Sequence, residues 1–188
     1  MRPVLEFFTT NSGKWTEVRE RLIPLGWTVL QNRRPLLEPQ AEELQEVARW
    51  KLGQLPRSRR WTLVEDSGLF VEGLKGFPGV YSAYALRTLG VTRLAQITPR
   101  DERKATFRAV MGLRSPLGQS RFFEGVAEGT LTLRPRGVGG FGFDPIFIPR
   151  GERKTFAEMS PTEKNERSHR GRALDKLVDH LGKIPPEA

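Results

Sequence analysis

The 188-residue sequence contains no cysteine, only two histidines and no long apolar run. The lack of cysteine excludes disulfides and thiolate metal sites, and only His169 and His180 can offer an imidazole. A bound metal would therefore have oxygen ligands. This favours Mg²⁺ over zinc, with Mn²⁺ as a substitute.

No apolar stretch approaches the roughly 20 residues of a membrane-spanning helix. The first residues, Met1 to Val4, lead into a predicted strand rather than a signal peptide. We therefore expect a cytoplasmic protein. Its length fits a single domain that covers residues 1–188.

Lys and Arg number 31 against 22 Asp and Glu, which gives a formal net charge of +9. Such a balance favours a polyanionic partner. Nucleic acid, a nucleotide and an anionic membrane surface all satisfy this condition, and the charge alone does not choose among them.

Strand and helix periods alternate along the chain, which indicates a mixed α/β fold. Helices are expected after the first strand, where Trp15, Val18 and Leu22 are helically spaced, then at 41–52 and 81–89, and in the tail. A loop is expected at 73–80 and a turn at 115–118. The predicted strands are 4–8, 27–30, 61–65, 105–113, 121–126 and 130–134.

Two carboxylates, Glu65 and Asp66, follow the apolar pair Leu63-Val64. Ser67-Gly68 has the composition of a turn, so the strand is predicted to end here, with both acids at its carboxyl end. Sheets of α/β proteins usually bind ligands at that edge. Taken alone, an ordinary acidic turn explains these residues better.

The turn Thr9-Thr10-Asn11-Ser12-Gly13-Lys14 after the first strand could hold a phosphate. It offers free backbone N–H groups at a helix start and a mobile lysine. The alternative is a helix cap at Asn11 or Ser12 with a surface lysine.

A glycine-rich segment, 137–145, matches the dinucleotide pattern G-x-G-x-x-G. We reject this match because the following residues, 144–149, contain two prolines among β-type residues and should be extended rather than helical. Phe141 and Phe143 could form a slot for a nucleobase, since aromatic faces stack on bases. A core hairpin with buried phenylalanines is the alternative.

The tail shows clear helix signals. Ser160-Pro161-Thr162-Glu163 is a capping box with proline at the first helical position, and Ser168 should cap the last helix. Leu174, Leu177, Val178 and Leu181 form an apolar stripe. The cap would direct His169 and Arg170 at a carbonyl oxygen or phosphate. The alternative is that the basic segment 164–170 is a solvated turn, which is the usual explanation for such a segment.

Six motifs occur in one order: Thr10-Asn11-x-x-Lys14, Glu38-Pro39-Gln40, Glu65-Asp66-Ser67-Gly68-Leu69, Gly76 to Ser82, Gly140 to Phe147, and Ser168-His169-Arg170. In these motifs the sequence resembles the inosine/xanthosine triphosphate pyrophosphatase family, from about residue 4 to about residue 178. Two positions depart from the common pattern: Glu65 stands where Asp is more familiar, and Phe143 where many members have Tyr or Trp.

The resemblance implies an ITPase-like fold: a central mixed, largely antiparallel sheet flanked by helices, in two lobes with the active site in the cleft between them. It implies hydrolysis of non-standard purine nucleotides (ITP, dITP, XTP) to a nucleoside monophosphate and pyrophosphate, by Mg²⁺-assisted attack of water at the α-phosphorus. The expected partner is a nucleotide, with no stable nucleic acid or membrane partner. A homodimer is also implied, since relatives commonly form dimers.

The resemblance also assigns residues. Phosphate binding falls to Thr10, Asn11, Lys14, Lys51, Ser67 and Lys164. Metal binding is assigned to Glu38, Glu65 and Asp66, and Asp66 is also the leading general base. Base binding falls to Phe141, Phe143, Asp144, Ser168, His169 and Arg170, where donors from His169 and Arg170 would pair with the keto oxygen at purine position six.

Two alternatives stay open. One is a Maf-like pyrophosphatase that acts on modified pyrimidine nucleotides. The other is a non-catalytic, basic nucleic-acid-binding protein, which would have no use for Glu38, Glu65 and Asp66 close to a phosphate path.

Overall fold

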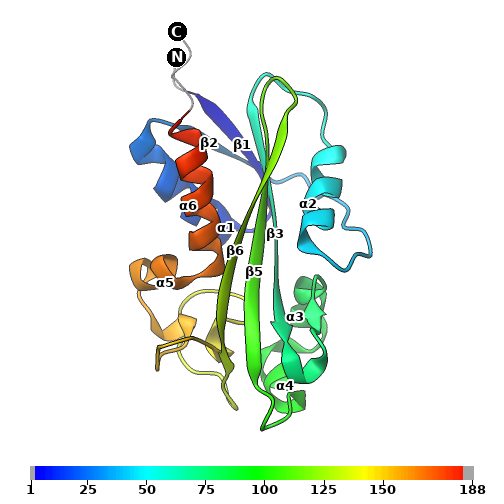
Figure 1. Cartoon of the computed structure of the whole chain (residues 1–188), viewed down its shortest axis with the longest axis vertical. Coiled ribbons are helices and arrows are strands. Elements are labelled where there is room, and N and C mark those ends of the chain that lie inside the picture. The colour runs from blue at the N-terminus through cyan, green and yellow to red at the C-terminus, as the bar shows by residue number, and fades with distance from the viewer. Residues whose placement is uncertain (1–2, 184–188) are drawn as a thin grey trace. The chain divides into compact units, whose positions relative to one another are not determined.

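The computed structural model describes residues 3–183 and has a mixed α/β fold (Figure 1). Met1 and Arg2, which the sequence assigns to the approach to the first strand, lie outside these residues. Within the described chain, one sheet has seven strands. Six follow the order β2-β1-β3-β5-β6-β7, and β4 pairs with β3. The strands are β1 (Val4–Phe8), β2 (Thr28–Asn32), β3 (Trp61–Val71), β4 (Pro78–Gly79), β5 (Lys104–Arg114), β6 (Ser120–Leu131) and β7 (Phe147–Pro149).

The sheet is mixed, as predicted. β1 pairs in parallel with both β2 and β3, whereas β3 pairs antiparallel with β4, and β6 antiparallel with β7. β5 and β6 are neighbours joined by the predicted turn, in which the Gly118 N–H donates to the Ser115 carbonyl at 2.9 Å. Among the described helices, none combines the length and apolar character needed to cross a bilayer.

The chain packs as two compact units. Within the described residues, the first comprises 3–66, 110–124 and 173–183, and the second 67–109 and 125–172. β3, β5 and β6 each contribute residues to both units. The expected cleft between two lobes, and the single functional domain, stay predictions.

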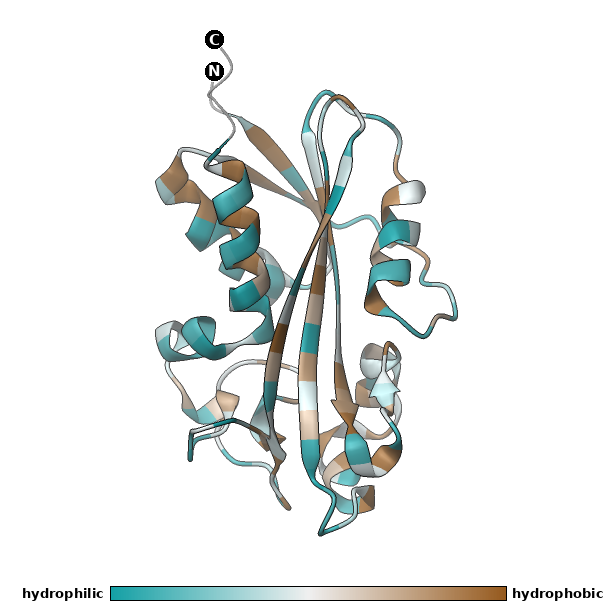
Figure 2. Ribbon diagram, viewed as in Figure 1, coloured by the Kyte–Doolittle hydropathy of each residue, from teal (hydrophilic) through white to brown (hydrophobic). Residues whose placement is uncertain are grey.

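The first unit contains α1 (Ser12–Leu22), a short 3₁₀ turn η1 (Ile23–Leu25), α2 (Leu44–Gly53) and most of α6 (His169–Leu181). Asn11 caps α1, and Arg21 of α1 forms an ion pair with Asp175 of α6. Helices α1 and α6 lie on one side of the strands and α2 on the other (Figure 1). The stripe of α6 is confirmed, because Leu174, Leu177 and Leu181 are buried; Figure 2 shows this helix with alternating hydrophobic and hydrophilic bands.

The second unit contains α3 (Ser82–Thr88), α4 (Gly90–Ile97) and α5 (Pro161–Arg167), with 3₁₀ turns η2 (Glu72–Leu74), η3 (Asp144–Ile146) and η4 (Phe156–Glu158). Its core is rich in aromatic rings: Phe107 meets Phe147 edge-on at 4.7 Å, and Phe147 lies 5.1 Å from Phe156. Helix α4 was not predicted, although Val91, Leu94 and Ala95 have helical spacing and the last two are buried.

The prediction that a turn at Ser67-Gly68 ends the third strand is wrong. β3 continues to Val71, so Glu65 and Asp66 lie in the middle of a strand and not at its carboxyl end. A Cβ on Gly68 would overlap the carbonyl of Gly79, whose strand β4 pairs with β3. The glycine therefore permits a close approach of backbone instead of a turn.

A similar correction applies to the predicted strands 121–126 and 130–134. They form one strand, β6, which ends at Leu131. Gly129 lies opposite Pro149 of β7, and a Cβ there would overlap the Ile148 carbonyl.

The rejection of a dinucleotide fold is confirmed, because residues 144–149 form the 3₁₀ turn η3 and the short strand β7 rather than an α-helix. The expectation of a fully extended segment was wrong at residues 144–146.

Candidate functional site

In the first unit, five charged side chains form what we call the acid–lysine cluster: Lys14, Glu38, Lys51, Glu65 and Asp66. Lys51 of α2 lies between two carboxylates, with its Nζ 2.7 Å from Oε1 of Glu38 and 2.6 Å from Oδ1 of Asp66. The same Nζ donates to the backbone carbonyl of Glu65 at 3.2 Å. The three segments that carry these residues are thus joined through one ammonium group.

Glu65 has a different partner. Its side chain has no exposed surface, and Oε1 lies 3.4 Å from Nζ of Lys14 in the first turn of α1. Neighbours on a strand point to opposite faces of the sheet, which explains why Glu65 and Asp66 meet different lysines. The two adjacent acids are therefore not an equivalent pair.

Burial and charge shift the protonation equilibria of this cluster. Burial raises the pKa of Asp66 above its ordinary value, and the positive charges of Lys51 and Lys14 oppose that rise. For Lys51, burial is the largest effect and lowers the pKa, but Asp66 and Glu38 together raise it above the ordinary value. A buried carboxylate with a raised pKa is suited to take a proton from water.

The donor atoms of the cluster fit an oxygen-ligated divalent cation. Oδ2 of Asp66 is buried and has no hydrogen-bond partner among the described residues, and the side chain of Glu38 is 48% exposed. Mg²⁺ is usually held by one or two protein carboxylates together with substrate phosphates, so Glu38 and Asp66 suffice. No group of three His, Asp or Glu side chains in residues 3–183 is arranged to hold a metal. The assignment of Glu65 as a third ligand stays a prediction.

The predicted phosphate turn shows the capping arrangement. Oδ1 of Asn11 accepts a hydrogen bond from the Lys14 N–H at 3.1 Å, and Oγ1 of Thr9 accepts one from the Asn11 N–H at 3.1 Å. Thr10 is exposed, and Ser67, in the second unit, is half-buried on β3. A cap and a phosphate site are compatible, so the phosphate roles of these residues stay predictions.

In the second unit, Phe141, Asp144, Lys164 and Arg170 form what we call the Phe141 cluster. Oδ2 of Asp144 accepts hydrogen bonds from the Phe141 N–H at 2.7 Å and from Nζ of Lys164 at 2.8 Å. The Lys164 ammonium lies 4.3 Å from the centre of the Phe141 ring, and the Arg170 guanidinium 5.1 Å from it. Burial raises the pKa of Asp144, and Lys164 opposes this rise.

Two predicted residues have neighbours that the sequence did not indicate. Lys164, assigned to phosphate, contacts the residues assigned to the base, and its side chain is only 6% exposed. Phe143 is buried in the apolar core of the second unit with Phe147 and Phe156. Phe143 thus matches the core-hairpin alternative, whereas Phe141 is partly exposed between two cations.

The predicted cap at Ser168 is confirmed, since its Oγ accepts a hydrogen bond from the Gly171 N–H at 2.9 Å. Ser168, His169 and Arg170 are all buried, which excludes the solvated basic turn. The His169 imidazole stacks on the Phe107 ring, with 4.6 Å between the ring centres and 8° between the planes. Phe107 occupies an ordinary inward position of β5, and nothing in the sequence marks it as a partner of the histidine.

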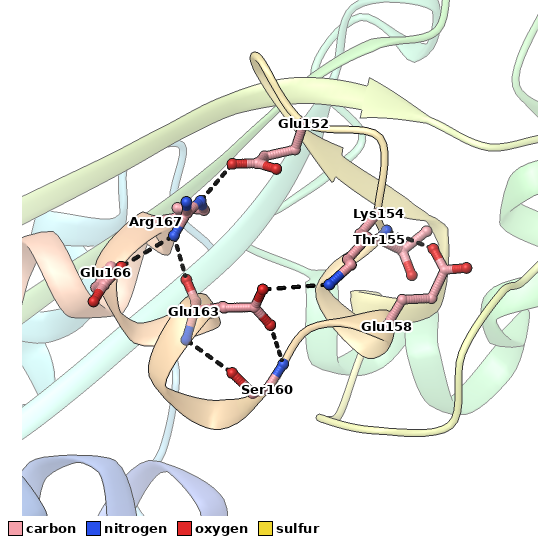
Figure 3. A network of polar contacts seen from close by, with 8 residues as sticks. All are labelled: Glu152, Lys154, Thr155, Glu158, Ser160, Glu163, Glu166 and Arg167. Carbon is pink, nitrogen blue, oxygen red and sulfur yellow. Dashed lines mark hydrogen bonds and ion pairs between the residues drawn. The ribbon is translucent and has the colours of Figure 1, made fainter.

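A network of polar contacts holds the segment that carries Lys164 (Figure 3). Ser160 and Glu163 form the predicted capping box of α5, and Thr155 and Glu158 form a second box that was not predicted. Arg167 at the end of α5 contacts Glu152 at 2.5 Å. These contacts fix both ends of the short helix.

A buried carboxylate with a raised pKa in contact with a lysine, here Asp66 and Lys51 in a mixed α/β fold, is the arrangement expected of an enzyme active site. The chain belongs to the Ham1 family, whose model matches residues 5–180. The family predicted from the sequence motifs is thereby confirmed.

Known proteins resemble the chain over nearly its full length. It is 46% identical to a dITP/XTP pyrophosphatase from Thermococcus kodakarensis, over 94% of this chain and 96% of that protein. It is 43% identical to a dITP/XTP pyrophosphatase from Pyrococcus horikoshii, over 93% and 95%. The solved structure of a HAM1 protein from Coxiella burnetii matches with a TM-score of 0.77 and 29% identity, covering 97% of this chain and all of that one.

Proposed function

We propose that this protein hydrolyses ITP, dITP and XTP to the nucleoside monophosphate and pyrophosphate. The observation that carries the proposal is the acid–lysine cluster, in which buried Asp66 combines a raised pKa with an oxygen atom that has no partner among the described residues. The relatives named dITP/XTP pyrophosphatase support the substrate class and favour it over the Maf-like and nucleic-acid-binding alternatives.

Water would attack the α-phosphorus in line with the leaving pyrophosphate, and the bond between the α-phosphorus and the bridging oxygen would break. Asp66 would accept the proton of the attacking water or help to hold Mg²⁺, with Glu38 as the second carboxylate. Bound Mg²⁺ would neutralise phosphate charge and polarise the phosphoryl group. Lys14 and Lys51 would bind phosphate oxygens as charge forms on the leaving group.

Selectivity would depend on hydrogen-bond polarity in the second unit. Donors from the segment Ser168-His169-Arg170 would pair with a keto oxygen at purine position six, whereas adenine carries an amino donor there. Each buried polar group left without a partner costs roughly 1–3 kcal/mol, so ATP should be a poor substrate. Phe141 would stack on the base.

A substrate panel with Asp66→Asn as the variant tests this proposal. The wild-type protein with Mg²⁺ should release pyrophosphate from ITP, dITP and XTP well above the release from ATP or UTP. Loss of a general base costs about 10²–10⁴-fold, so Asp66→Asn should lose turnover to this extent but still bind nucleotide. Release of phosphate instead of pyrophosphate would contradict attack at the α-phosphorus, and near-normal rates in the variant would remove Asp66 from catalysis.

We also propose that the protein is a cytoplasmic homodimer that takes free nucleotides and forms no stable complex with nucleic acid or membranes. The resemblance to the pyrophosphatase family supports the dimer, and the nucleotide substrate supports the location. Light scattering of the protein as it elutes from a size-exclusion column would measure the mass of the dimer directly. A monomer mass at all protein concentrations would contradict the proposed dimer.

A further inference from the structure

The ammonium group of Lys51 lies within a set of three oxygen atoms. They are Oε1 of Glu38 at 2.7 Å, Oδ1 of Asp66 at 2.6 Å and the Glu65 carbonyl at 3.2 Å. An ammonium has three N–H donors, so these contacts match its full hydrogen-bonding capacity. The side chains of Lys51 and Asp66 are only 10% and 8% exposed, so little water reaches the contact.

Two of these oxygens belong to the carboxylates that would hold Mg²⁺ in the proposed function. Mg²⁺ requires near-ideal octahedral geometry at about 2.0–2.1 Å from its ligands. An ammonium already in contact with both carboxylates competes with the metal ion for the same oxygen atoms. An ammonium and a metal ion bound to the same two carboxylates would also repel each other strongly in a poorly solvated site.

We propose that Lys51 is a placeholder cation: it occupies the carboxylate pair in the absence of nucleotide and must leave when the divalent metal binds. The inference rests on the proposed function for the identity of the metal. The flexible stem of lysine can carry the ammonium to another anion, and the phosphates of a nucleotide supply one. Metal binding and polyphosphate binding are then coupled, and by linkage each strengthens the other by the same factor.

The variant Lys51→Met tests this coupling without any measurement of turnover. Two variants serve as matched controls. Lys14→Met removes the other lysine of the cluster, which pairs with Glu65, and Lys176→Met removes an exposed lysine of the same unit that donates to the Glu124 carbonyl. All three variants lose one positive charge, so they have the same net charge and differ in where that charge is removed.

Binding of Mn²⁺ to the nucleotide-free proteins, followed by electron paramagnetic resonance, gives the result. Lys51→Met should bind Mn²⁺ about tenfold more tightly than wild type, within the range of about 5–150-fold usual for coupled sites. Lys176→Met should match wild type, and Lys14→Met should change much less than Lys51→Met. Equal affinities in Lys51→Met and wild type, or equal gains in Lys51→Met and Lys14→Met, would overturn the proposal.

Loss of Lys51 could prevent folding, because it leaves Asp66 buried without its cation. A second measurement therefore uses the wild-type protein: acetylation of Lys51, quantified by mass spectrometry. Mg²⁺ that fills the site, as judged by displacement of Mn²⁺, should make Lys51 react faster, and Na⁺ at matched ionic strength should not. Unchanged protection of Lys51 in the Mg²⁺-filled protein would overturn the proposal. Neither readout depends on pyrophosphate release, so the placeholder role and the proposed activity can fail separately.

Discussion

The glycine pair Gly140 and Gly142 allows a sharp test of how the Phe141 cluster is held together. Both glycines have positive φ, at 70° and 66°. A Cβ on Gly142 would meet nothing within 4 Å, whereas a Cβ on Gly140 would overlap Oδ2 of Asp144 and lie 3.0 Å from its Cγ. The two alanine variants therefore have the same kind of backbone strain, but only Gly140→Ala also displaces the Asp144 carboxylate.

The strain of an alanine in the left-handed region costs about 1–2 kcal/mol. In Gly140→Ala the Asp144 carboxylate must also move away from the Phe141 N–H and from Lys164, which lie 2.7 and 2.8 Å from its Oδ2. A hydrogen bond to a charged group contributes about 1.5–3 kcal/mol, so the additional loss should be about 3 kcal/mol. Urea unfolding followed by tryptophan fluorescence should therefore show Gly142→Ala destabilised by about 1 kcal/mol and Gly140→Ala by about 4 kcal/mol.

Nucleotide binding should separate the two variants in the same order, because Asp144 fixes the backbone of Phe141 and the position of Lys164. Gly140→Ala should bind inosine monophosphate more weakly than Gly142→Ala in equilibrium titrations. Equal unfolding free energies for the two variants would refute the reasoning, since they would show that the contacts of Asp144 contribute nothing beyond the backbone strain.

Two further predictions concern the second unit. Phe107→Leu should reduce the preference for ITP over ATP by about two- to tenfold, because an aromatic pair such as Phe107 and His169 contributes about 0.5–1.5 kcal/mol. The control variant Phe147→Leu leaves the stacked histidine in place, so it should lose stability but keep its selectivity. Equal selectivity in the two variants would contradict a role for the stack. The Ser160 backbone N–H lowers the pKa of Glu163 to about 2, so this carboxylate stabilises the fold above pH 4.5 and loses that contribution as the pH falls toward 2. The difference in melting temperature between wild type and Glu163→Gln should therefore disappear between pH 4.5 and pH 2. A difference that stays constant with pH would contradict the assignment.

The helix caps were predictable because their signals are local. The cap at Asn11, the box at Ser160 and Glu163, and the cap at Ser168 each involve residues at most three positions apart, and each is present in the structure. The same rule applied to Thr155 and Glu158 would have found the second box. Capping depends on hydrogen bonds within one turn, so tertiary contacts rarely overrule it.

The strands were less predictable, and both errors have one cause. Gly68 was predicted to belong to a turn, and Gly129 lies in the gap between two predicted strands, 121–126 and 130–134. In the structure each glycine lies inside a long strand, where another backbone comes too close for a side chain. The approaching residues, Gly79 and Ile148, are 11 and 19 positions away. A sequence shows that a glycine is present, while the reason for it depends on strand pairing that local patterns do not encode.

Residue types of the candidate site were predictable, but their partners were not. The resemblance assigned both Glu65 and Asp66 to the metal, with Asp66 as the leading general base. The alternation of a strand directs the two side chains to Lys14 and Lys51 respectively. The correct strand length was needed for this inference, because acids at a strand end have no fixed faces. The stack of Phe107 on His169 joins residues 62 positions apart and had no signal in the sequence.

The three lysines assigned to phosphate share a property that the net charge of +9 conceals. Each already contacts a carboxylate: Lys14 with Glu65, Lys51 with Glu38 and Asp66, and Lys164 with Asp144. A polyanion that recruits such a lysine leaves a poorly solvated carboxylate without its counter-ion, which is costly unless another cation replaces it. A divalent metal would replace Lys51 at Glu38 and Asp66 and would bring one more positive charge than the ammonium that leaves. The internal ion pairs therefore favour a ligand that arrives with its own divalent cation, and among anions of the cell the nucleoside triphosphates meet that condition.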